Sequence, residues 1–387
     1  MISFQLSEEQ QAIRALAREF SQKEIAPVAA ELDRTEQHPA EVMKKAWETG
    51  LLNLTIPEEY GGVGLGAFEE VLVAEEFAAG CAGISTSVMA NSLALTPIIQ
   101  SGTPEQLREF IQPFNEEPRL AAFCLTEPSA GSDVAGMRST AERVGDEYVI
   151  NARKHWITNG SVASLYTLFV KTDPSERHRG ISAFIVPADT PGISHGKKEE
   201  KMGQRASDTR EVIFEDVRAP VANRLGEEGQ GWMIAMKTLD KARPGVAALG
   251  LGVARAALTA ALEYAQEREQ FGQPIVNFQM IQKMLADMAI GLETARLMVW
   301  KAAWLIDNGQ DNNYESSIAK AYATDLAMHA TTDAVQIFGG YGYSREYPVE
   351  KYMRDAKLLQ IYEGTNQIQR VVIARNLLRR GQQLLLQ

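Results

Sequence analysis

The hydrophobic pattern of this 387-residue chain changes its period twice, and each change limits what a segment can fold into. In the first 118 or so residues apolar side chains recur at helical spacing, as at Ile13, Leu16 and Phe20. Residues 119–230 contain short segments rich in Val, Ile, Phe and Tyr, separated by Gly, Pro and Asp, which is typical of strands. The helical period then returns. We therefore expect a mainly α protein with an inserted β domain: a helical domain at 1–118, a β domain at 119–230 and a second helical domain at 231–387.

Charge, cysteine and histidine content exclude several classes of protein. The formal net charge of −11 argues against nucleic-acid binding, which depends on clustered Lys and Arg. Cys81 and Cys124 have no CxxC spacing and lie among apolar residues, which predicts free thiols in a reducing compartment. The five histidines have no metal-ligand spacing, so we expect no metal site.

The start of the chain predicts its location. MISFQL leads directly into a helical pattern, without the features of a signal or transit peptide. The sequence also has no run of 18 or more apolar residues. We expect a cytoplasmic, bacterial protein that does not insert into a membrane.

Residues suited to chemistry lie where the three blocks meet. In CLTEPSAGSD (124–133), small residues after a predicted strand let backbone amides approach a ring or phosphates closely. HWITNG (155–160) places an indole, which can cover a flat ring, beside hydroxyl and amide donors. Taken alone, these stretches are equally a loop and a buried Trp beside a turn. QIYEGTNQIQR (360–370) puts one carboxylate, Glu363, at a break between helices, where an acid also complements a helix dipole.

An ordered set of motifs resembles the acyl-CoA dehydrogenase family. It consists of EEYGG, TEPSAGSD, WITNG, MGQRASDTREVIFEDV, REQFG, QIFGGYGYSREYPVEKYMRD and IYEGTNQIQR. The chain is similar to the medium-chain type, which acts on short or medium straight-chain acyl groups. The resemblance implies an N-terminal helical domain, a middle β-barrel-like domain and a C-terminal four-helix bundle. It also implies bound FAD, a homotetramer arranged as a dimer of dimers, and electron transfer to electron-transferring flavoprotein.

The resemblance assigns cofactor contacts to three groups of residues. The first would meet the flavin ring from the β domain: Phe123, Leu125, Thr126, Gly131, Ser132, Trp156, Ile157 and Thr158. The second would reach the adenosine diphosphate part of FAD across a subunit boundary: Arg268, Phe271, Gln279, Gln336 and Gly340. Thr365 and Gln367 would touch the cofactor from the N-terminus of their own helix, a place that suits phosphate or ring oxygens.

The resemblance also makes Glu363 the catalytic base. This residue would remove the α-proton of an acyl-CoA thioester while the β-hydrogen leaves as hydride to flavin N5, giving the trans-2-enoyl-CoA. The pKa of Glu363 must be raised for this task, because the α-proton is far less acidic than a carboxylic acid, and burial supplies that rise. The backbone N–H of Glu363 would stabilise the thioester oxygen as charge develops on it.

Substrate contacts carried over from the family are Ser132, Asp240, Arg243, Tyr362, Gly364 and Arg375. Asp240 and Arg243, three residues apart, are equally suited to an ion pair on one face of a helix. Isovaleryl- and long-chain-type relatives carry their catalytic glutamate at the position of Ala242. Because this chain has an alanine there, the resemblance places the base at 363. Because medium-chain enzymes usually have Thr at this point, Ala242 leaves the preferred acyl length open.

Other functions remain as alternatives. One is a short branched-chain acyl-CoA dehydrogenase of amino-acid catabolism. Another is an acyl-CoA oxidase-like flavoenzyme, although oxidase chains are generally longer and carry an added C-terminal domain. The third is a non-catalytic helical interaction protein of the same fold, against which the presence of Glu363, Thr126 and Thr158 argues.

Overall fold

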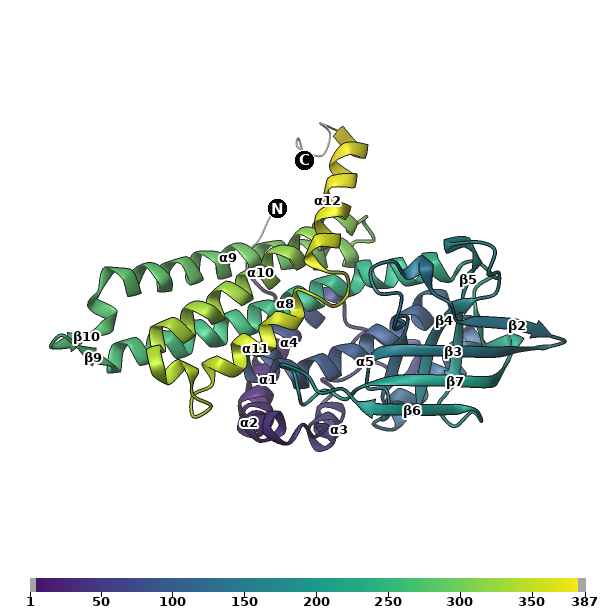
Figure 1. The fold of residues 1–387 in the computed structure, drawn as a ribbon, viewed down its shortest axis with the longest axis horizontal. Coiled ribbons are helices and arrows are strands. Elements are labelled where there is room, and N and C mark those ends of the chain that lie inside the picture. The colour runs from purple at the N-terminus through teal and green to yellow at the C-terminus, as the bar shows by residue number, and fades with distance from the viewer. Residues whose placement is uncertain (1–4, 382–387) are drawn as a thin grey trace.

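The first part of the chain is helical in the computed structural model, which describes residues 5–381 (Figure 1). Ser7 begins the first helix with a capping box, since its hydroxyl accepts from the Gln10 N–H and its own N–H donates to the Gln10 side chain. Two π-helical stretches, Ser21–Ile25 and Leu107–Ile111, interrupt the helical run. The α-helices are α1 (Glu8–Phe20), α2 (Ala26–Thr35), α3 (Ala40–Glu48), α4 (Ala67–Gly80), α5 (Ala82–Ser101), α6 (Pro104–Gln106) and α7 (Pro113–Glu116).

The β domain is one mixed sheet with the order β6-β7-β3-β2-β4-β5-β8, in which β1 pairs in parallel with β4. The predicted hairpin through Gly145 and Asp146 joins β2 to β3. Alternate residues of β4 enter two different cores: Tyr166 packs inside the β domain, and Phe169 packs against helices. The strands are β1 (Ala121–Cys124), β2 (Thr140–Val144), β3 (Glu147–Thr158), β4 (Leu165–Lys171), β5 (Ile181–Pro187), β6 (Ile193–Lys198), β7 (Thr209–Pro220) and β8 (Arg224–Leu225).

The C-terminal part returns to helices, as predicted. Four of them, α8 (Gly231–Glu267), α9 (Gln279–Asp307), α10 (Asn313–Phe338) and α11 (Val349–Leu359), run alongside one another, whereas α12 (Asn366–Arg380) projects away (Figure 1). A small hairpin, β9 (Glu269–Gln270) and β10 (Gln273–Pro274), joins α8 to α9 at the far end from the sheet. The predicted order of helical, β and helical domains is therefore confirmed. The domain boundaries after residues 118 and 230 stay predictions.

Two helices, α5 and α8, are long and apolar enough to span a membrane by length and composition. Their most apolar windows are 72% and 67% buried inside the protein, as in core helices of soluble proteins, which pass the same test. Core packing accounts for their composition, because closely packed helices need small residues at their contacts. A Cβ at Gly252 of α8 would lie 2.3 Å from the carbonyl oxygen of Glu75 in α4.

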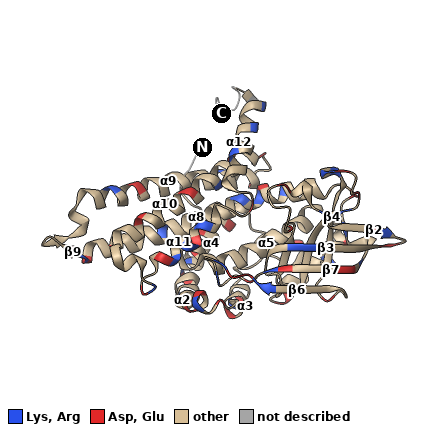
Figure 2. Ribbon diagram, in the orientation of Figure 1, with Lys and Arg blue, Asp and Glu red and all other residues tan. Residues whose placement is uncertain are grey.

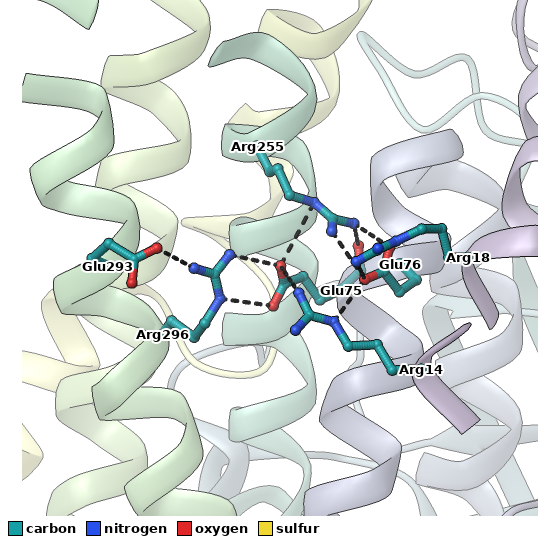
Figure 3. Close-up of polar contacts among 7 residues, drawn as sticks. All are labelled: Arg14, Arg18, Glu75, Glu76, Arg255, Glu293 and Arg296. Atoms are coloured by element: carbon teal, nitrogen blue, oxygen red, sulfur yellow. Dashed lines mark hydrogen bonds and ion pairs between the residues drawn. The ribbon is translucent and has the colours of Figure 1, made fainter. Parts of the chain in front are cut away.

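Both signs of charge are distributed over the helical domains and the sheet (Figure 2). One charged cluster is buried, where α1 and α4 meet α8 and α9 (Figure 3). Glu75 and Glu76 of α4 are almost completely buried and are surrounded by four arginines. These arginines are Arg14 and Arg18 of α1, Arg255 of α8 and Arg296 of α9. The cluster ties the N-terminal helix to the C-terminal bundle through charge-assisted hydrogen bonds.

Candidate active site

Glu363 lies in the turn between α11 and α12, where the helical chain breaks. Its backbone is left-handed, with φ of 54°, and Gly364 follows with φ of 91°. A side chain on a left-handed residue is uncommon, so surrounding contacts must hold it in place. The turn takes the carboxyl group off both flanking helices.

Buried polar side chains hold this turn. Lys320 of α10 donates from Nζ to the Gly364 carbonyl at 2.9 Å and to Oδ1 of Asn366 at 2.9 Å. Gln369 of α12 donates from Nε2 to the Gly364 carbonyl at 2.9 Å and to the Glu363 carbonyl at 3.3 Å. Lys320, Asn366 and Gln369 are all buried. The carbonyls of the strained dipeptide are therefore bonded from two helices.

The carboxyl group of Glu363 is poised to take up a proton. Its Oε2 atom is buried and has no hydrogen-bond partner within residues 5–381. Burial raises the pKa of Glu363 to about 7, even though the positive charges of Lys320 and Arg243 act in the opposite direction. The neighbouring Glu70 raises it further. A carboxyl group with such a pKa is a competent general base at neutral pH.

The residues predicted to contact substrate fall into separate places. Asp240 and Arg243 of α8 form the ion pair that their spacing predicted as the alternative, and Arg243 is buried. Asn313 also donates to Asp240 Oδ1, at 2.8 Å. The hydroxyl oxygen of Tyr362 lies 3.3 Å from Oγ1 of Thr86. Tyr362 and Gly364 are part of the turn, and Arg243 acts on the Glu363 carboxyl through its charge. Ser132 is exposed in the β-domain loop, and Arg375 is exposed on α12.

Residues predicted to meet the flavin ring lie around one edge of the β domain. The N–H of His155 in β3 donates to the Thr126 carbonyl at 2.9 Å, which joins the 125–132 loop to the strand that carries Trp156 and Thr158. The Trp156 side chain is 56% exposed, its backbone is left-handed with φ of 61°, and it lies at a register shift between β3 and β7. Gly131 and Ser132 are exposed in the loop, while Phe123 lies against Phe169 in the core.

The buried members of this group are limited in how they can contact a ligand. Leu125 and Ile157 are buried, so only their backbone groups are suited to such contacts. Behind the loop, Lys154 is fully buried, donates to the Leu125 carbonyl at 3.2 Å and pairs with Glu127 at 2.8 Å.

The residues predicted to reach the adenosine part of FAD are far from this edge. They gather at the opposite end of the helical bundle, near the β9–β10 hairpin (Figure 1): Arg268, Phe271, Gln279, Gln336 and Gly340. Helix α8 starts against the backbone of β5 and ends at this hairpin, and its 37 residues rise about 55 Å. Phe271 is 93% exposed at the hairpin. A single chain therefore does not bring these residues to the edge of its own β domain where the predicted flavin contacts lie.

Thr365 and Gln367, the last predicted cofactor contacts, lie at the start of α12. The Thr365 hydroxyl caps this helix by accepting from the Ile368 N–H at 3.2 Å, and Gln367 is exposed.

Several residues of the site were absent from the sequence prediction. Lys320, Asn366 and Gln369 hold the turn, and Gln204 of the MGQRASDT motif accepts from the Thr86 hydroxyl at 2.7 Å. Gln204 also binds Asp355 of α11 through its backbone N–H and its side-chain amide. The motif therefore connects the β domain to the helix that precedes the catalytic turn.

A helical, β and helical order, with a half-buried glutamate whose Oε2 atom has no partner in the described part of the chain, is typical of the acyl-CoA dehydrogenase class. Three domain families match in that order: acyl-CoA dehydrogenase N-terminal domain at residues 7–117, middle domain at 122–217 and C-terminal domain at 229–378. The chain belongs to the acyl-CoA dehydrogenase family.

Several similar proteins are short-chain enzymes. The short-chain specific acyl-CoA dehydrogenase, mitochondrial, of Rattus norvegicus is 46% identical, over 97% of this chain and 92% of the rat protein. The short-chain specific acyl-CoA dehydrogenase of Clostridium acetobutylicum is 43% identical, over 98% of this chain and all of the clostridial one.

Solved structures agree with these relatives. Butyryl-CoA dehydrogenase from Megasphaera elsdenii has a TM-score of 0.96 and 45% identity, with 98% of this chain and all of that one covered. A chain from a study of the electron transferring flavoprotein of Acidaminococcus fermentans has the same TM-score, 47% identity and the same coverage. The FAD complex of PigA has a TM-score of 0.93 and 31% identity, with 98% of this chain and all of PigA covered.

Proposed function

We propose that this protein is an FAD-dependent short-chain acyl-CoA dehydrogenase that converts a fatty acyl-CoA to the trans-2-enoyl-CoA, as in fatty acid β-oxidation. Family membership and the short-chain relatives support the reaction class. The observation that carries the chemical assignment is the Glu363 carboxyl, whose Oε2 atom is buried and unpaired among residues 5–381 and whose backbone lies in a left-handed turn. Its raised pKa suits a base for a thioester α-proton.

The residues around Glu363 prepare the proton transfer. Lys320 and Arg243 place positive charge near the carboxyl and favour its ionised form before substrate arrives. An acyl chain that covers the site removes water and strengthens the affinity of the carboxylate for a proton. The backbone N–H of Glu363 is our candidate donor to the thioester oxygen, where charge builds up as the proton leaves.

The β-domain edge fits a flavin. An exposed tryptophan on a bulged strand offers an aromatic face, and Thr126 and Thr158 offer hydroxyl groups beside it. We assign the flavin ring to this edge, with contacts from Phe123, Leu125, Thr126, Gly131, Ser132, Trp156, Ile157 and Thr158. When bound, FAD supplies the acceptor for the β-hydrogen, which leaves the substrate as hydride.

A second copy of the chain completes the cofactor site in this proposal. The residues predicted to contact the flavin ring and those predicted to contact the adenosine diphosphate part lie at opposite ends of α8. One cofactor therefore cannot reach both groups within one chain. Helix α9 also exposes apolar side chains seven residues apart, Ile290, Leu297 and Trp304, at 65%, 48% and 50%. Such a heptad-spaced stripe is suited to packing against another helix. We propose a homotetramer, arranged as a dimer of dimers.

The short-chain relatives favour a short acyl chain. We therefore propose butyryl-sized substrates over octanoyl-sized ones. Beside Glu70, which acts on Glu363, a cavity of about 10 Å³ lies between α4 and α5. Met89 lines this cavity, and its methyl carbon lies 2.6 Å from where a Cβ on Gly245 of α8 would be. A space of that size holds about one water molecule, so an acyl chain that extended into it would have to displace Met89.

Acceptor and location are also proposals. The similarity to a chain studied with an electron transferring flavoprotein supports electron-transferring flavoprotein as the redox partner. Cys81 and Cys124 are both free and buried, which suits a reducing compartment such as the cytoplasm.

Anaerobic reduction by substrate tests the proposed function. The purified protein should be yellow, and butyryl-CoA should bleach it. Glu363→Gln should keep the colour but slow the bleaching by at least about 10²-fold, because it removes the base. Glu346→Gln, the same change at an exposed glutamate, should bleach at the parental rate. A colourless protein, or a Glu363→Gln variant that reduces as fast as the parent, would refute the assignment, and preferential bleaching by 2-methylbutyryl-CoA would indicate the branched-chain alternative.

A further inference from the structure

A completely buried lysine lies directly beneath the catalytic turn. Lys320 has no exposed surface, although it belongs to the middle of the long helix α10. Burying an ammonium group is costly unless hydrogen bonds and nearby charges compensate. Within residues 5–381, the Lys320 ammonium group donates its hydrogen bonds to the Gly364 carbonyl and to Oδ1 of Asn366, both at 2.9 Å. Both acceptors follow Glu363 in the chain.

The turn needs such an anchor. Glu363 and Gly364 are consecutive left-handed residues, and the Cβ of a glutamate makes this backbone conformation sterically unfavourable. The Gly364 carbonyl accepts from Lys320 on one side and from Gln369 on the other. These two bonds fix the Gly364–Thr365 peptide unit, and Gln369 also donates to the Glu363 carbonyl at 3.3 Å. The backbone that carries the Glu363 carboxyl group is therefore held on both sides of Gly364.

Charge gives Lys320 a second effect that a neutral anchor would lack. Burial lowers the pKa of Lys320 to about 7, the negative charges of Glu363 and Asp325 raise it, and Arg243 lowers it. In turn, Lys320 is the first of the charges that oppose the burial-induced rise in the pKa of Glu363. The charged groups that act on this pair from the surrounding elements are Glu70 of α4, Arg243 of α8 with its partner Asp240, and Asp325 of α10.

We propose that Lys320 is a positioning residue for the catalytic base: it holds the Gly364 carbonyl, and it supplies positive charge that favours the ionised carboxylate of Glu363. This inference rests on the proposed function, since it assigns Lys320 a part in the same proton transfer. It predicts effects on the chemical step and on its pH dependence, with a smaller effect on substrate binding.

Lys320→Met tests both effects, because methionine keeps the length of the side chain but removes its donors and charge. We expect the rate of flavin reduction by saturating butyryl-CoA to fall by about 10- to 100-fold, as for a displaced reacting group, with KM changed less than threefold. The acidic limb of the kcat/KM profile should move to higher pH, on the order of one pH unit, because the carboxyl loses a positive neighbour and its pKa rises.

Two further variants separate positioning from general destabilisation. Lys320→Arg keeps the charge, so the acidic limb should remain within about 0.3 pH units of the parent even if the larger side chain lowers the rate. Lys154→Met removes an equally buried lysine, whose partner is Glu127 in the β domain. It should lower the urea midpoint of unfolding without moving the acidic limb.

The outcomes are distinct. If the parent bleaches with butyryl-CoA but Lys320→Met keeps the parental rate and pH profile, the role of Lys320 is refuted and the proposed function stands. The role of Lys320 is also refuted, and the proposed function still stands, if Lys154→Met moves the acidic limb of the kcat/KM profile as far as Lys320→Met does. If Lys320→Met does not fold, a shift of the limb in Lys320→Arg by as much as one pH unit refutes the charge effect. A parent that butyryl-CoA does not reduce refutes the proposed function itself.

Discussion

The buried charge cluster around Glu76 makes a quantitative prediction about what holds the N-terminal helix to the bundle. Burial opposes ionisation of Glu76, but hydrogen bonds from Arg255, Arg18 and Arg14 outweigh it and lower the pKa of Glu76 from 4.5 to about 2. This difference corresponds to ~3 kcal/mol of stabilisation of the folded state at neutral pH. Glu76→Gln removes this contribution and leaves Glu75 as the remaining carboxylate beside Arg14 and Arg255, so we expect a loss of about 3 kcal/mol.

The sign of the pH dependence follows from the lowered pKa. The stabilisation is fully present above the unfolded pKa, near 4.5, and is lost as pH falls toward about 2. The difference in unfolding free energy between parent and Glu76→Gln should therefore shrink from ~3 kcal/mol at pH 7 to roughly 1 kcal/mol at pH 3.

Urea unfolding followed by circular dichroism, at both pH values, measures this difference. Glu19→Gln is the matched control. Glu19 lies on the exposed side of the same helix α1 and pairs with Lys23, so its replacement should change the midpoint of unfolding little. A Glu76→Gln protein as stable as the parent at pH 7, or a difference that does not change with pH, would contradict the reasoning.

Three other predictions concern the site and the assembly. Because burial raises the pKa of Glu363 to about 7 and the base acts in its ionised form, kcat/KM for butyryl-CoA should fall about tenfold per pH unit below that value. Steady-state profiles measure this, and a flat profile down to pH 5 would contradict it. Met89→Ala should enlarge the cavity beside Glu70 and raise kcat/KM for octanoyl-CoA relative to butyryl-CoA by at least about tenfold. An unchanged ratio would show that Met89 does not limit chain length. Leu297→Glu should place charge in the α9 stripe and yield smaller species with less FAD in sedimentation and absorbance measurements, whereas a yellow tetramer would show that the stripe is not an interface.

The sequence was sufficient for the order of the domains and for the break that carries Glu363. The hydrophobic patterns of helices and strands have clearly different periods. Ser7 begins one helix and Gly339 ends another through the properties of the local sequence alone. The motifs also assigned a flavin contact to one edge of the β domain, and this assignment stays a prediction. Sequence spacing did not decide between the two roles of Asp240 and Arg243. The structure shows their ion pair, and a role toward CoA stays a prediction.

The anchors of the turn were missed for a physical reason. A lysine in an alanine-rich helix normally faces solvent, whereas Lys320 is completely buried. Its spacing gave a usable signal, since Ser316 and Thr324, four residues away on either side, share its buried face. Gln204 gave no comparable signal. Its contacts with Thr86 and Asp355 join residues more than a hundred positions apart, which only the tertiary fold brings together.

Proton exchange at the substrate tests the central claim most directly. A butyryl-CoA analogue with sulfur in place of the β-carbon cannot transfer hydride, but its α-proton remains removable. In D2O, ionised Glu363 should take that proton, exchange it with solvent and return deuterium to the same carbon, with no net oxidation. Mass spectrometry should show incorporation of α-deuterium by the parent and by Glu346→Gln, and incorporation at least about 10²-fold slower with Glu363→Gln. Equal exchange by Glu363→Gln and the parent would contradict the account.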